Sequence, residues 1–145
     1  MRDDVPMIMV GPGTGIVPFV AFAEERAHLK TGKEAHLFFG CREKNNDFIY
    51  RDFFADMMDK KVIDSYNLAF SRPQDGSPKN YVQDVLATKE ELIVRLFKEE
   101  KGCLYICGAT KMGADVQTLI KKVLGEDEFK KMQTEKRVIV ELWSS

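Results

Sequence analysis

The chain has 145 residues, of which 44% are hydrophobic and 31% are charged, and its formal net charge is −1. This size and composition suit one globular domain with a real core and exclude a disordered chain. They also exclude a general nucleic-acid binder, and no run approaches the roughly 20 apolar residues of a membrane span.

Along the chain, strand-like apolar runs alternate with helical patterns. The expected strands are 7–10, 35–39, 67–70, 103–107 and 137–142, and the expected helices include 19–29, 50–58 and 112–124. A further helical face at 92–97 follows Thr88 and Glu91, whose spacing is that of a capping box. Strands that alternate with helices predict an α/β fold, a five-stranded parallel sheet with helices on both faces.

The cysteines and histidines indicate neither a disulfide framework nor a metal site. Cys41, Cys103 and Cys107 are odd in number and form no Cys-x-x-Cys pair, which favours a reducing compartment. His28 and His36 stand far from the cysteines at no metal-ligand spacing.

Ligands of parallel α/β sheets bind beyond the carboxyl ends of the strands, so the residue types after each strand matter most. The first strand is followed by a glycine-rich loop: Gly11, Pro12, Gly13, Thr14 and Gly15. Such a loop before a helix suits a pyrophosphate, because glycines allow close backbone approach and the helix offers free N–H groups. The Lys-Ser or Lys-Thr of an ATPase loop is absent, which disfavours an ATPase. A plain strand-to-helix turn is the alternative.

The second and third strand ends carry cations. Arg42 stands where an NAD enzyme of the common type has a ribose-binding carboxylate. Ser71 and Arg72 follow the third strand, with Lys79 and Tyr81 shortly after. A hydroxyl, two cations and a phenol suit a phosphate monoester beside an aromatic base, such as the 2′-phosphate of an adenosine. The alternative is a solvated basic loop.

The last two strands bring a thiol, an acid and the only tryptophan. Cys103 and Cys107 are four residues apart and so share one face; Cys107, at the strand end, is expected at the ligand edge. Glu141 lies two residues before Trp143, so the two alternate to the same side if the strand continues. The tryptophan either anchors in the core or covers a flat ligand.

As an ordered set, these motifs resemble the NADP-binding module of the ferredoxin–NADP reductase superfamily, in its diflavin reductase branch. The resemblance covers nearly the whole chain and implies a Rossmann-like fold. It rests on Gly11-Pro12-Gly13-Thr14-Gly15, Gly40-Cys41-Arg42, Ser71-Arg72, Lys79-Asn80-Tyr81-Val82-Gln83, Tyr105-Ile106-Cys107-Gly108, Met112 with Asp115-Val116, and Trp143.

The resemblance implies NADP(H) as the bound cofactor. The loop 11–15 would carry the pyrophosphate, with the Thr14 hydroxyl and Arg42 assisting. The 2′-phosphate would be held by Ser71, Arg72, Lys79 and Tyr81. Gln83 would sit near the adenosine half, and Asp115 would close the nucleotide site.

The resemblance also implies the chemistry at the other end of the nucleotide. Cys107 and Glu141 would lie beside the nicotinamide, and Trp143 would stack on an FAD isoalloxazine and move aside for hydride transfer. Electrons would then pass through FMN to a haem protein. This chain departs from the family at two positions, with Ala109 where an Asp is usual and Glu141 where an Asp is more common.

The motifs of the family's FAD-binding barrel and of its FMN domain are not in these 145 residues. We therefore expect residues 1–145 to form one NADP(H)-binding module, a C-terminal piece of a longer flavoprotein, inactive without its FAD domain. We expect its partners to be its own FAD and FMN domains and a haem acceptor, on the cytoplasmic side, with a parent protein that the family allows to be anchored to the endoplasmic reticulum. A non-catalytic NADP(H) sensor is the alternative from another class.

Overall fold

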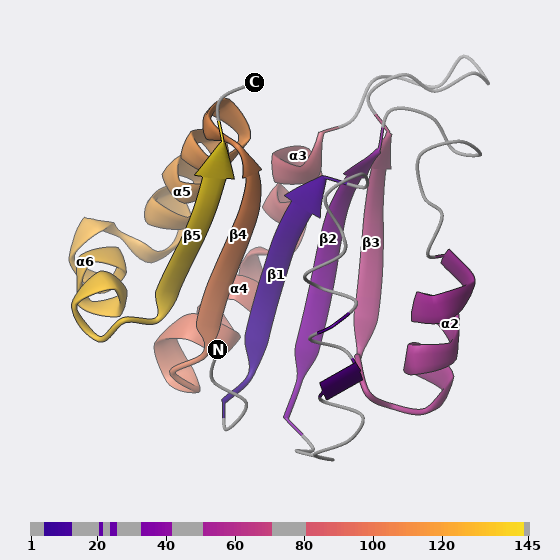
Figure 1. Cartoon of the computed structure of the whole chain (residues 1–145). Coiled ribbons are helices and arrows are strands. Elements are labelled where there is room, and N and C mark those ends of the chain that lie inside the picture. The colour runs from indigo at the N-terminus through magenta and orange to yellow at the C-terminus, as the bar shows by residue number, and fades with distance from the viewer. Residues whose placement is uncertain are drawn as a thin grey trace.

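A five-stranded sheet forms the centre of the computed structural model, which describes residues 5–12, 21, 24–25, 33–41, 51–70 and 81–143. The strand order is β3-β2-β1-β4-β5, and all neighbours pair in parallel (Figure 1). The strands are β1 (Met7–Pro12), β2 (Ala35–Cys41), β3 (Ser65–Phe70), β4 (Cys103–Ala109) and β5 (Val138–Trp143). The predicted fold class is confirmed, and each strand begins and ends within two residues of its predicted limits.

The central strand β1 is buried on both faces of the sheet, which explains why its sequence is apolar at every position. Met7, Ile8, Met9 and Val10 are all at most 1% exposed. Met7 and Met9 pack into a core cluster on one face of the sheet, whereas Ile8 and Val10 pack into a second cluster on the other face. A parallel strand covered on both sides needs apolar residues at every position.

Helices cover both faces of the sheet. Helix α2 (Arg51–Asp59) lies on the first face, where the Phe54 ring is 5.3 Å from that of Phe39 (Figure 1). The opposite face is covered by α3 (Val82–Ala87), α4 (Glu90–Ile93), the π-helical segment η2 (Val94–Glu99), α5 (Thr110–Leu124) and α6 (Glu126–Thr134). The helices predicted at 50–58 and 112–124 are confirmed, whereas α3 and α6 were not predicted. Most of the helix predicted at 19–29 lies outside the described residues.

The capping box predicted at Thr88 is wrong. Helix α4 begins at Glu90 with Lys89 as its N-cap residue and without a side-chain cap. Thr88 instead ends α3, and its hydroxyl donates to the Val85 carbonyl at 2.7 Å. The preceding short helix, which the sequence pattern did not reveal, uses the hydroxyl that the capping box required.

Two residues join η2 to the amino ends of β4 and β5. A Cβ atom at Gly102 would lie 2.7 Å from the Pro6 carbonyl oxygen and 2.9 Å from that of Leu96, so only glycine fits there. Arg137 is 2% exposed, and its Nη1 donates to the carbonyl oxygens of Phe97 at 2.9 Å and Gly102 at 3.0 Å. The buried guanidinium therefore satisfies backbone groups that would otherwise lack partners.

Candidate functional site

The carboxyl ends of the strands form one edge of the sheet, at the arrowheads of Figure 1. At this edge β4 lies between β1 and β5. Cys107 is the register partner of Glu141, and Ala109 is the register partner of Trp143. The structure therefore brings together the thiol, the acid and the tryptophan position that the sequence placed at two separate strand ends.

Cys107 is a buried thiol at this edge. It is 3% exposed and belongs, with Cys103, to the core cluster on the first face, so the predicted shared face of the two cysteines is confirmed. Burial raises the pKa of the Cys107 thiol, and the negative charge of Glu141 raises it further. A thiol held in its neutral form can contact a ligand as a small polar group, but it is a poor nucleophile.

Glu141 is exposed on the edge strand β5, which continues through Trp143 as the alternation argument required. Tyr105, two residues before Cys107 on β4, is a diagonal neighbour of Glu141, and the Glu141 carboxylate helps to raise the pKa of Tyr105. Sequence reasoning quoted Tyr105 within a motif but gave it no role. The available signal was the period-two spacing, which places it on the same face as Cys107.

A second group of predicted residues gathers where α3 meets α5. Gln83 Nε2 donates to Asp115 Oδ2 at 3.4 Å, a contact between residues 32 apart in the sequence. Lys111 Nζ lies 3.2 Å from the same oxygen, an ion pair of i,i+4 spacing that sequence reasoning missed. Tyr81 is the N-cap residue of α3 and is 48% exposed, so its ring stands open to a ligand at the start of that helix.

The remaining predicted residues are described in part or not at all. Gly11 and Pro12 end β1, opposite Phe39 and Gly40 of β2, and Gly11 is buried. The side chains of Pro12 and Trp143 lie outside the described part. So do seven whole residues: Gly13, Thr14, Gly15, Arg42, Ser71, Arg72 and Lys79.

The comparisons with known proteins identify the family of this chain. Residues 9–118 match the family model of the oxidoreductase NAD-binding domain. The chain belongs to this family. Over 99% of its length it is 36% identical to the NADPH–cytochrome P450 reductase of Musca domestica and 37% identical to that of Rattus norvegicus. Over 90% of its length it is 42% identical to the nitric oxide synthase of Anopheles stephensi. This NAD-binding domain spans 23% of the length of those reductases and 11% of that synthase.

The last two residues of β4 lead directly into α5. Gly108 has φ 151°, a conformation that favours glycine. Ala109 is the N-cap residue of α5, and it offers no side-chain acceptor to the N–H groups of the first turn. The first turn of α5 also carries no acidic residue, so the structure gives no substitute there for the missing Asp.

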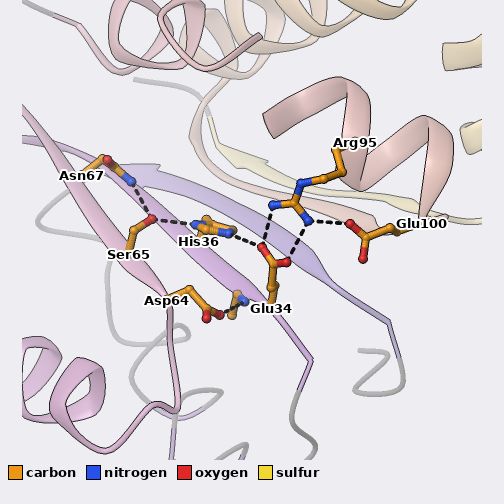
Figure 2. A network of polar contacts seen from close by, with 8 residues as sticks. Glu34, His36, Asp64, Ser65, Asn67, Arg95 and Glu100 are labelled. Atoms are coloured by element: carbon orange, nitrogen blue, oxygen red, sulfur yellow. Dashed lines mark hydrogen bonds and ion pairs between the residues drawn. The ribbon is translucent and has the colours of Figure 1, made fainter. Parts of the chain in front are cut away.

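A polar network lies at the other end of the sheet, at the amino ends of β2 and β3 (Figure 2). His36 Nδ1 lies 2.7 Å from Ser65 Oγ, and His36 Nε2 lies 2.9 Å from Glu34 Oε2. Arg95 donates to both carboxylate oxygens of Glu34, at 2.7 and 2.9 Å, and to Glu100. Sequence reasoning missed this cluster, because its members come from three separate segments.

The order serine, histidine, glutamate in this network is that of a hydrolase triad, but the charges argue for a structural role. The Arg95 guanidinium, with a smaller effect of His36, lowers the pKa of Glu34 to about 2. The Arg95 guanidinium already pairs with both oxygens of this carboxylate, so Glu34 serves the ion pair with Arg95 rather than a catalytic base. The network instead ties η2 to β2 and β3.

In the described part of the NAD-binding domain, no cluster of His, Cys, Asp and Glu is arranged to hold a metal ion. Nor does that part contain a helix with the length and apolar character needed to cross a membrane.

Proposed function

We propose that this chain is the NADPH-binding module of a diflavin oxidoreductase of the NADPH–cytochrome P450 reductase type. NADPH supplies a hydride to FAD, and FMN passes the electrons to a haem protein such as cytochrome P-450. The observation that carries the proposal is the pairing at the carboxyl edge, with Cys107 opposite Glu141 and β5 running on to Trp143. The similarity to such reductases over 99% of the chain supports it.

The nucleotide half of the proposal uses the residues at the β1, β2 and β3 ends. The loop 11–15 binds the pyrophosphate through backbone N–H groups, aided by the Thr14 hydroxyl and by Arg42. Charge-assisted hydrogen bonds to the 2′-phosphate come from a set of four side chains: Ser71, Arg72, Lys79 and Tyr81. Gln83 and Asp115, which contact each other between α3 and α5, border the adenosine side.

The nicotinamide half uses β4 and β5. Cys107 gives the ring a neutral, buried neighbour, and Glu141 offers a hydrogen-bond acceptor for the carboxamide. Trp143 covers the flavin face and yields to the nicotinamide. A buried neutral thiol beside an exposed carboxylate fits an uncharged, amide-bearing ring better than it fits an anion.

The rest of the activity belongs to domains outside this chain. The FAD and FMN domains of the parent protein are its partners, and the chain alone does not oxidise NADPH. The parent works on the cytoplasmic side, in a reducing compartment.

Alternatives of two classes are open to test. The 42% identity to a nitric oxide synthase supports the same module in a synthase, and methionine synthase reductase is a third diflavin parent. A non-catalytic NADP(H) sensor is an alternative of another class, which needs neither Cys107 nor Glu141 nor Trp143 at the edge. The complete reading frame separates the two classes: upstream FAD and FMN domains support a diflavin enzyme, and a frame without them favours the sensor.

Calorimetric titration with 2′,5′-ADP and with 5′-AMP tests the nucleotide assignment. We expect tighter binding of 2′,5′-ADP, and the substitution Arg72→Ala should weaken that binding by about 1.5–3 kcal/mol, the value of a hydrogen bond to a charged group. Binding of 5′-AMP should not change. Lys98→Ala, which removes an exposed cation of η2, is the matched control and should affect neither ligand. Equal affinities of the wild-type chain for the two ligands would overturn the 2′-phosphate assignment.

A further inference from the structure

Tyr105 is a buried phenol that the proposed function does not use. It lies on β4 two residues after Cys103 and two before Cys107, and all three belong to the core cluster on the first face of the sheet. Only 6% of Tyr105 is exposed. A buried hydroxyl needs a hydrogen-bond partner, and here that partner decides what the residue does.

The carboxylate of Glu141 on β5 is within reach of the Tyr105 hydroxyl and contributes to the raised pKa of Tyr105. In the parallel register Tyr105 is opposite Ile139, and Glu141 is opposite Cys107, so Tyr105 and Glu141 are diagonal neighbours on adjacent strands. Long side chains reach such diagonal neighbours on one face of a sheet. Burial, together with Glu141, raises the pKa of Tyr105, so the phenol stays protonated and donates to the carboxylate.

This hydrogen bond matters because Glu141 is otherwise exposed on an edge strand. An exposed glutamate has several accessible rotamers, and holding it in one of them costs conformational entropy. The Tyr105 ring is already fixed by the core, so it can restrain Glu141 without losing much freedom of its own. The last residue of β4 is Ala109, so β4 contributes no carboxylate beside Glu141 at this edge.

We propose that Tyr105 is a positioning residue, whose hydroxyl holds the Glu141 carboxylate beside the Cys107 thiol. Its consequence for hydride transfer rests on the proposed function, in which these two groups border the nicotinamide. The restraint itself is a property of this chain and can be measured without any nucleotide or flavin.

The test follows the Cys107 thiol by NMR in the whole chain carrying ¹³Cβ-labelled cysteine, with Cys107→Ser to assign its signal. Glu141→Gln removes the negative charge, so the thiol should titrate at lower pH than in the wild type. Tyr105→Phe keeps the ring but frees the carboxylate, so it should shift the titration in the same direction. In the Glu141→Gln background, Tyr105→Phe should add no further shift, because the carboxylate charge is already gone.

Two outcomes would overturn the proposal. One is that Tyr105→Phe leaves the Cys107 titration unchanged. The other is that Tyr105→Phe shifts this titration equally in the wild type and in Glu141→Gln, which a change in packing would produce. If Tyr105→Phe does not fold, the phenol titration near 295 nm in Glu141→Gln decides instead. Tyr105 should then ionise at lower pH than in the wild type, and an unchanged titration contradicts the hydrogen bond. Titration with 2′,5′-ADP is the independent control: Tyr105→Phe should leave its affinity unchanged, so failure of the nucleotide assignment and failure of the restraint are told apart.

Discussion

Replacing Glu34 by glutamine tests the polar network at the amino ends of the strands. In the folded chain the pKa of Glu34 falls from 4.5 to about 2, first because of the Arg95 hydrogen bonds and then because of His36. A fall of about 2.5 units corresponds to about 3.4 kcal/mol at 1.36 kcal/mol per unit. Because 34% of the Glu34 side chain and 42% of the Arg95 side chain are exposed, solvent screening reduces this value to about 1–2 kcal/mol.

The pH dependence gives the sharper test of this prediction. Since the folded-state pKa is lower than the unfolded-state pKa, the contribution of Glu34 is fully present above about pH 4.5. It is lost as the pH falls from 4.5 towards 2. Urea unfolding should therefore show Glu34→Gln less stable than the wild type by about 1–2 kcal/mol at pH 7. That difference should narrow steadily between pH 4.5 and pH 3.

The matched control is Glu99→Gln, which changes an exposed acid of η2 that is outside the network. Its stability difference from the wild type should be small throughout. A Glu34→Gln difference that stays constant from pH 7 to pH 3 would refute the reasoning, because the neutral hydrogen bonds alone would then account for the effect.

Two further stability predictions concern the junction of η2 with the strands. Arg137→Met should destabilise the chain by about 2–6 kcal/mol, because two buried carbonyl oxygens lose their donor at about 1–3 kcal/mol each. Thermal and urea unfolding measure this loss of stability, and a loss below about 1 kcal/mol would contradict the assigned role. Gly102→Ala should also cost more than about 1 kcal/mol, because the new Cβ meets backbone oxygens that cannot move aside. Gly113→Ala is the informative comparison, since the atoms nearest to its Cβ belong to the Leu142 side chain, which can move, and not to the backbone. Equal losses in the two alanine variants would contradict this distinction.

Some of the fold was accessible from the sequence because it depends on local pattern. The uninterrupted apolar run at 7–10 indicated a strand buried on both faces, and the structure has Met7–Val10 fully enclosed. The alternation of side chains along a strand likewise placed Cys103 and Cys107 on one face. The capping-box prediction failed because local pattern was ambiguous there. Thr88 could end one helix or begin the next, and α3 is too short to leave a periodic signal.

The strand ends marked where a ligand site would lie, but not which residues would meet there. The sequence alone identified the alternation of strands and helices, the residue types at each strand end and the family motifs. Only the tertiary structure decided the strand order, with β4 between β1 and β5, and so the pairing of Cys107 with Glu141. The contacts of Tyr105 with Glu141 and of Gln83 with Asp115 join residues more than 30 positions apart. Such contacts depend on inter-strand register and on how helices pack against the sheet, which local side-chain patterns do not encode.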